Sequence, residues 1–207
     1  TLITVVNNNT KEILTWGEGD WTPESPEIDG LNVTYTSCQD EKELLSKFGD
    51  WWVKNTPDIV TGWNIEFFDI PYLMNRFARV FGKNDEFKEN KVRNSFSPFD
   101  MTRKKVVTMM GKAHTLYEIK GVAQLDYLDL YKKFTYTVRE SYKLDYIAEV
   151  ELGYKKLENN HETFKEFYEK DWNRFVDYNI IDSKLVDDLE DKMKLIELAL
   201  TMAFDAK

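Results

Sequence analysis

The sequence predicts an α/β domain in which helices flank a mixed β-sheet, and three observations lead to this fold class. Short β-branched or alternating segments dominate the first 36 residues, and helical spacing dominates from about residue 162 to the end. Between them, short apolar runs and helical stretches are interleaved. This mixed order favours a layered α/β domain over a helix bundle or a β-sandwich. The length suits one domain, and we expect residues 1–207 to form a single domain.

The N-terminal part is expected to contain three strands and a helix. Two β-rich segments, residues 2–6 and 13–16, lie on either side of an Asn-rich turn and predict a hairpin. Apolar and polar residues alternate over residues 31–36, which predicts a third strand. Ser37, with Asp40 three residues later, is typical of a capping box, so a helix should begin there. Its apolar residues have the spacing of one buried face and are Leu44, Leu45, Phe48, Trp51 and Trp52.

The middle of the chain is expected to combine strands, a helix and a second hairpin. Residues 58–63 form a short apolar run that suits a buried strand in parallel pairing. A helix is expected from near Pro71 to Gly82, and a long surface loop over the polar residues 83–103. Helical spacing returns at residues 144–148. The predicted hairpin consists of residues 105–108 and 115–119. A further strand is expected over residues 125–130.

Composition excludes several classes of protein. The net charge of −9 argues against a basic protein that wraps nucleic acid, although residues 83–112 hold eight basic and four acidic residues and are locally positive. The single cysteine, Cys38, forms no internal disulfide, which suits a reducing compartment. No apolar run approaches the roughly 18 residues of a membrane span. We therefore expect a soluble intracellular protein with no membrane partner.

One segment concentrates residues that can carry chemistry, at the junction between the strand 58–63 and the following helix. Open α/β sheets present their functional groups at such strand ends. There, Asp69 could bind a divalent cation through a carboxylate oxygen, and Asn64 could hydrogen-bond a nearby ligand. The alternative is that Asp69 only caps the helix that begins near Pro71.

A second candidate lies in the C-terminal helical region. Tyr178 and Asp182 are four residues apart, so they share one helix face and can point into the same pocket. Tyr-x-x-x-Asp occurs often by chance, and the alternative is a solvated helix face.

Together, four segments resemble the 3′–5′ exonuclease domain of family B DNA polymerases, of the type found in T-even-like tailed bacteriophages. The resemblance covers nearly the whole chain in the correct order. Its segments are Asn64–Asp69 with Pro71-Tyr72 and Asn75-Arg76, then residues 125–134, 141–147 and 178–182.

The resemblance implies a ribonuclease-H-like fold that holds two divalent metals, Mg²⁺ or Mn²⁺, with four carboxylates. Its second motif, Asn-x-x-x-Phe-Asp, falls on Asn64, Phe68 and Asp69, and its third, Tyr-x-x-x-Asp, falls on Tyr178 and Asp182. Asp69 and Asp182 would then be metal ligands, Tyr178 would orient the attacking water, and Asn64 and Phe68 would position the 3′ end of the DNA. Two metals suit phosphodiester hydrolysis because they activate water and stabilise the leaving oxygen.

The first motif of the family, Asp-x-Glu on the opening strand, has no counterpart at the expected place. The pattern occurs only at Asp188-Leu189-Glu190, after the third motif and in a helical segment, where residues two apart face different ways. By this resemblance, we expect the opening strand and its acidic pair to be absent from this chain. We expect this chain to bind metal weakly and to hydrolyse DNA poorly or not at all. We also expect self-association through exposed sheet edges, or a rearranged sheet.

The resemblance also gives the predicted hairpin a role, because related phage polymerases carry a hairpin here that helps to move primer DNA between two sites. Met110-Gly111 would form its tip, and Arg103, Lys104 and Lys105 could contact phosphates, although solvated loop charge is the alternative. The implied partners are a single-stranded 3′ end of DNA and the rest of a polymerase chain, in the cytoplasm of an infected bacterium. The competing functions are a non-catalytic module that binds single-stranded DNA or docks polymerase parts, and a related nuclease that acts on RNA.

Overall fold

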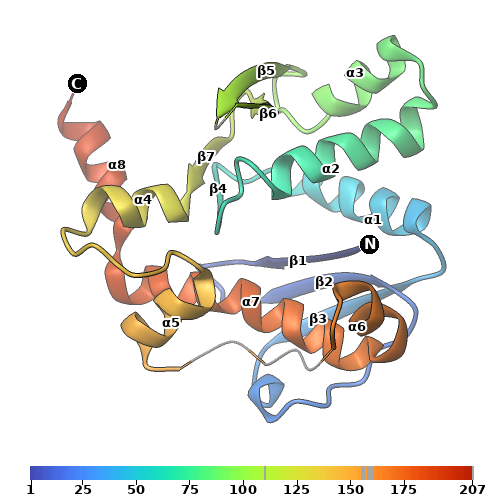
Figure 1. The fold of residues 1–207 in the computed structure, drawn as a ribbon. Coiled ribbons are helices and arrows are strands. Elements are labelled where there is room, and N and C mark those ends of the chain that lie inside the picture. The colour runs from blue at the N-terminus through green and yellow to red at the C-terminus, as the bar shows by residue number, and fades with distance from the viewer. Residues whose placement is uncertain (110, 155–156, 158–160, 207) are drawn as a thin grey trace. The chain divides into compact units, whose positions relative to one another are not determined.

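The structure, a computed structural model, describes residues 1–109, 111–154, 157 and 161–206 (Figure 1). The chain divides into two compact units: residues 1–44 with 138–194, and residues 45–137 with 195–207. Both units contain helices and strands, so the predicted mixed α/β class is confirmed. None of the helices in the described part combines the length and the apolar character that a membrane span requires.

The first unit is built on a three-stranded mixed sheet in the order β1-β2-β3. β1 (Leu2–Val6) and β2 (Ile13–Glu18) form the predicted antiparallel hairpin, and β3 (Val33–Cys38) pairs with β2 in parallel. A short 3-10 turn, η1 (Pro26–Ile28), lies between β2 and β3. The expected strands of this region are confirmed.

Helices from the C-terminal half complete the first unit. They are α5 (Leu144–Leu152), α6 (Phe164–Lys170) and α7 (Trp172–Met193). α7 packs against β1 and β2. Thr4 and Thr15, which face each other across the hairpin, join their hydroxyls at 3.0 Å, and Thr4 also donates to Asn179 Oδ1 at 2.7 Å. The core of this unit consists of Ile13, Ile28, Ala148, Val176, Ile180, Ile181 and Leu185.

Helix α1 (Glu41–Lys54) confirms the expected apolar face but begins later than the capping-box pattern indicates. Ser37 lies within β3, where its hydroxyl donates to Asp20. The side chain that accepts from the first turn is Asp40, at 2.8 Å from the backbone N of Glu43. The prediction of Ser37 as the cap was wrong, because β3 continues through that position.

The second unit contains the parallel pair β4 (Ile59–Gly62) and β7 (Ala123–Asp126) and the hairpin β5 (Thr102–Met109) and β6 (Lys112–Ile119). The parallel pairing of β4 and the second hairpin are confirmed. Its other helical elements are α2 (Asp69–Phe77), the π-helical turn η2 (Ala78–Gly82), α3 (Glu86–Asn94), α4 (Tyr127–Phe134) and α8 (Leu195–Asp205).

The expected loop over residues 83–103 was wrong, because it contains α3. This helix buries none of its residues, so it shows no apolar period that a sequence pattern could detect. It is stabilised at its start by Asp85, whose side chain accepts from Lys88 N, and along its side by an ion pair between Arg93 and Glu89. Gly82 allows α3 to lie close, because a Cβ there would be 2.9 Å from Glu89 Cα.

The expected strand over residues 125–130 was also partly wrong. β7 ends at Asp126, and Tyr127 begins α4. Tyr127 and Tyr131 are both fully buried one helical turn apart, which is helical spacing. Over so few residues the apolar pattern also fits a strand, and that is why the sequence was ambiguous.

Candidate functional site

The loop that joins β4 to α2 carries the second motif of the resemblance. Its backbone is compact, because Phe68 N–H donates to Asn64 O and Ile70 N–H donates to Ile65 O, both at 3.1 Å. Asn64 has a φ of +67°, in the left-handed region that asparagine tolerates better than most residues. We call residues 63–68 the β4–α2 loop. It brings Asn64, Phe68 and Asp69 to the carboxyl end of β4, as the motif predicts.

Asp69 is the first residue of α2. The cap position is Phe68, which makes no side-chain cap hydrogen bond, so Asp69 does not act as the N-cap residue. The residue as a whole is exposed, but protein crowds its carboxyl group; this burial, with a smaller contribution from the charge of Asp126, raises the pKa of Asp69 to about 6. A carboxylate that is poorly stabilised by its own protein gains more from a bound cation.

Glu66, Asp126 and Asp129 are further acids in this neighbourhood. Burial and the negative charges of Asp129 and Asp126 raise the pKa of Glu66, and the positive charge of Lys105 on the hairpin opposes that shift. The end of β4 is therefore an electronegative region. Within it, the β5 strand contributes a basic side chain.

Phe68 and Tyr72 form an exposed aromatic pair on the first turn of α2. Their ring centroids are 6.4 Å apart with planes only 9° from parallel, and the residues are 65% and 45% exposed. Exposed aromatic faces are the surfaces on which unpaired nucleobases stack.

Tyr178 and Asp182 lie one turn apart on α7, as predicted. Tyr178 is buried and packs edge-on against Phe167 and Phe164 of α6, with centroids 5.6 and 6.0 Å away. Asp182 is partly buried. The solvated-face alternative is therefore wrong for this pair. Tyr178 and Asp182 belong to the first unit, whereas Asn64, Phe68 and Asp69 belong to the second.

The hairpin residues expected to contact DNA are exposed. Arg103, Lys104 and Lys105 are consecutive on β5, so their side chains alternate between its two faces. Gly111, at the turn, has a φ of +75°, which suits glycine. Met110 lies outside the described residues.

Asp188-Leu189-Glu190 lies on α7, so this match to Asp-x-Glu is helical as expected. Asp188 pairs with Lys184 and accepts a hydrogen bond from the Tyr154 hydroxyl, whereas Leu189 and Glu190 are buried. These side chains therefore point in different directions and have structural partners.

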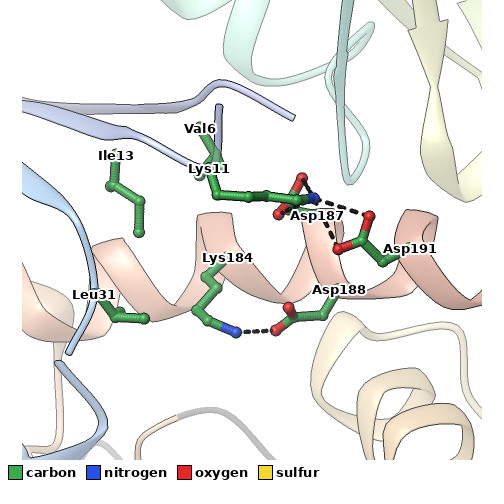
Figure 2. Close-up of a pocket in the computed structure, with 8 residues that line it drawn as sticks. All are labelled: Val6, Lys11, Ile13, Leu31, Lys184, Asp187, Asp188 and Asp191. Carbon is green, nitrogen blue, oxygen red and sulfur yellow. Dashed lines mark hydrogen bonds and ion pairs between the residues drawn. The ribbon is translucent and has the colours of Figure 1, made fainter. Parts of the chain in front are cut away.

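Asp188 also belongs to a group of three acids, with Asp187 and Asp191, whose oxygens lie within 4.8 Å of one another in the described part of the chain. These three acids are among the residues that line the pocket drawn in Figure 2. The pocket has a volume of about 210 Å³. Lys11 occupies the group, because its Nζ lies 2.9 Å from Asp187 and 2.7 Å from Asp191. Burial opposes the charge on Lys11, but these two carboxylates outweigh it and raise its pKa. A lysine thus supplies the positive charge that a metal would bring.

Two buried aspartates were missed by the sequence analysis as parts of the site's framework. Asp126 accepts hydrogen bonds from the β4–α2 loop, and Asp177, next to Tyr178, accepts from Trp21 Nε1, Glu24 N and Ser25 N at 2.8 to 2.9 Å. Each of these aspartates therefore holds a backbone segment that is far from it in the sequence. For Asp126 the sequence offers one signal, because an aspartate directly before the start of a helix often caps that helix.

Comparison with known families decides the relationship. The model of the exonuclease domain of DNA polymerase family B matches residues 4–147, which is more than half of the chain. The chain belongs to this family. The match includes the β4–α2 loop, the whole β5–β6 hairpin and the β1–β2 hairpin from residue 4 onwards, and the family implies a ribonuclease-H-like fold, in agreement with the mixed α/β structure.

Relatives of known identity agree. The chain is 40% identical over 175 residues to the DNA-directed DNA polymerase of Escherichia phage RB69 and 35% identical over 175 residues to that of Enterobacteria phage T4, each covering 84% of the chain. It is 30% identical over 145 residues to the DNA polymerase delta catalytic subunit of Plasmodium falciparum, covering 69% of the chain. The aligned region spans 18%, 19% and 12% of these relatives, so they are much longer proteins.

Proposed function

We propose that this chain acts as the 3′–5′ proofreading exonuclease domain of a phage-type DNA polymerase and removes nucleotides from a single-stranded 3′ end. The observation that carries the proposal is the position of Asp69. It lies at the carboxyl end of a parallel strand, within the family's second motif, with a carboxyl group that its own surroundings destabilise. The family match extends over residues of both units, which supports one exonuclease domain made from the whole chain.

The proposed metal ligands are Asp69 and Asp182. Their carboxylate oxygens are hard ligands of the kind that Mg²⁺ and Mn²⁺ prefer, and a bound cation would stabilise the charged form of Asp69, which burial disfavours. When bound, two such ions would activate water and stabilise the leaving 3′ oxygen. Tyr178, held by the aromatic contacts of α6, would orient the attacking water through its hydroxyl.

DNA would be held by residues of the second unit. The Phe68 and Tyr72 rings offer a platform for the terminal base, with Asn64 beside it as a hydrogen-bonding group. Arg103, Lys104 and Lys105 on β5 would contact phosphates, so the affinity for DNA should fall as salt rises.

We further propose that the 207 residues alone are a weak exonuclease. Their one Asp-x-Glu sequence lies on α7 with partners of its own, so this sequence does not supply the second pair of carboxylates. The remaining polymerase chain is the proposed partner. A β-strand with an unpaired edge would also favour self-association of the chain. Light scattering tests this, because the molar mass would then increase with protein concentration.

The second candidate function is a non-catalytic module that binds single-stranded DNA. The observations that favour it are the exposed Phe68–Tyr72 pair and the incomplete set of acids, since stacking requires no metal.

A titration with Mn²⁺ and a labelled single-stranded DNA separates the two functions. The exonuclease proposal expects weak Mn²⁺ binding that Asp69→Asn and Asp182→Asn each reduce by about tenfold or more, with slow 3′-end removal that both variants abolish. DNA affinity retained without any Mn²⁺ binding would favour the binding module. Rapid 3′-end removal that Asp182→Asn abolishes would refute the proposed weakness, and cleavage of RNA in preference to DNA would indicate a different nuclease.

A further inference from the structure

The side chain of Asp126 connects two segments of the second unit that are far apart in sequence. Its Oδ1 accepts from Leu128 N at 3.0 Å and Asp129 N at 3.4 Å, and these bonds cap α4. The same carboxylate accepts from two residues of the β4–α2 loop: Asn64 N donates to Oδ1 at 3.3 Å and Glu66 N donates to Oδ2 at 3.1 Å. The residue is 8% exposed.

The two bonds to the loop are not needed for capping. An aspartate that only caps a helix accepts from the second or third residue of that helix. Asp126 uses its second oxygen for Glu66, which lies 60 residues earlier in the chain. A buried carboxylate bonded to backbone N–H groups is a strong and directional contact, because each bond is assisted by charge.

The register of the parallel pair explains how this contact arises. Gly62, the last residue of β4, is paired with Asp126, the last residue of β7. Figure 1 shows β4 and β7 next to each other, and because both strands run in the same direction, the chain that leaves β4 starts beside the residue at which β7 ends. The loop N–H groups at Asn64 and Glu66 are then within its reach.

We propose that Asp126 is a positioning residue of the exonuclease site, which sets the place of Phe68 and Asp69 by fixing the loop that precedes them. The inference rests on the proposed function. With Asn64 and Glu66 fixed, the bonds from Phe68 N to Asn64 O and from Ile70 N to Ile65 O determine where α2 begins. The left-handed conformation of Asn64 is maintained by the same contact, since its own N–H is one of the donors.

Asp126→Ser separates this role from capping. A serine hydroxyl caps a helix nearly as well as aspartate, but it is one bond shorter and provides a single oxygen, so it cannot also reach Glu66. Asp129→Asn is the matched control. It removes a neighbouring charge that acts on Glu66, but the Asp129 side chain makes neither of the two loop bonds.

Hydrogen exchange of backbone amides in the full chain, measured with and without Mn²⁺, tests the proposal. In Asp126→Ser we expect the Glu66 amide to exchange about tenfold or more faster, with α4 amides changed less than about threefold, and Mn²⁺ affinity to fall about tenfold. Asp126→Asn also keeps one acceptor oxygen, but on a side chain as long as that of aspartate, so it can reach either the cap or the loop and should lie between Asp126→Ser and the unaltered chain in both measurements. Asp129→Asn should leave the exchange unchanged.

The outcomes distinguish failure of the positioning role of Asp126 from failure of the proposed function. If the unaltered chain binds Mn²⁺ through Asp69 and Asp126→Ser changes neither the loop exchange nor the affinity, the positioning role is refuted while the proposed function stands. Equal acceleration in the loop and in α4 would also refute it, because that result indicates a general loss of stability. If the unaltered chain binds no Mn²⁺, the proposed function fails together with any positioning role that depends on it, and faster exchange at Glu66 would then show only a structural contact.

Discussion

Two buried aspartates, one in each unit, hold backbone N–H groups in different ways. Asp177 lies in the second turn of α7, is fully buried, and fixes the segment 21–25 that follows β2. Asp126 lies where β7 ends and α4 begins, remains slightly exposed, and fixes the β4–α2 loop. In both cases a carboxylate accepts from backbone N–H groups. The segment held by Asp177 contains no proposed ligand, whereas the loop held by Asp126 leads directly into Asp69, a proposed metal ligand. Burial of a carboxylate therefore does not reveal by itself whether stability or function depends on it.

The largest effect is expected for Asp177→Ala. It leaves two backbone N–H groups and an indole N–H without their charged acceptor in a fully buried position, which should lower the free energy of unfolding by about 3 to 5 kcal/mol. Urea denaturation followed by circular dichroism measures this change. Glu27→Ala, at an exposed residue of η1, is the control and should change it by less than about 0.5 kcal/mol. Similar losses in both variants would show that Asp177 is not an anchor.

A smaller effect is expected for Trp21→Phe, which removes only one of the three donors to Asp177. The loss should be about 1.5 to 3 kcal/mol, because the acceptor is charged. The matched variant Trp172→Phe removes an indole N–H that donates to a neutral acceptor, the Asp20 carbonyl, at the same 2.9 Å. Its loss should be smaller by about half. The reverse order in urea denaturation would contradict the importance of the charge.

The smallest effect, and one of opposite sign, is expected for Asp69→Asn. The pKa of Asp69 in the fold, about 6, exceeds its ordinary value, so its ionised form disfavours folding; this penalty is fully present above pH 6 and absent below about pH 4. Without metal, the melting temperature of the variant should be about 2 to 4 °C higher than that of the unaltered chain at pH 7.5. At pH 4 the two melting temperatures should be the same. Calorimetry in a chelator measures this. An equal increase at both pH values would assign the effect to something other than charge.

The comparison also shows which features the sequence could predict. Strands β1 to β4, both hairpins, α1 and the C-terminal helices follow from β-branched or apolar segments and from helical spacing. The pattern is clearest in α1, which buries Leu44, Leu45 and Phe48 on one face. Helix α3 was missed because it buries none of its residues and depends on the Asp85 cap and on charge pairs along its surface. The boundary between β7 and α4 was missed because a few apolar residues before a helix fit either period.

The candidate site was predictable only in part, for a related reason. Asn64, Phe68, Asp69, Tyr178 and Asp182 form short motifs, so the family resemblance could locate them. Asp126 and Asp177 act on residues 60 or more positions away, and a single sequence contains no sign of such contacts. Asp177 in particular looks like a solvated residue of a long helix, although it is fully buried.

The register between β4 and β7 has a consequence for how the chain is made. Synthesis delivers Asn64 and Glu66 long before Asp126, which follows 62 and 60 residues later. These two N–H groups cannot find their acceptor until the segment that contains Asp126 has left the ribosome. The β4–α2 loop can therefore take its final form only late, after the intervening hairpin β5–β6 has emerged, and the segment that leads into Asp69 is among the last parts of this unit to be fixed.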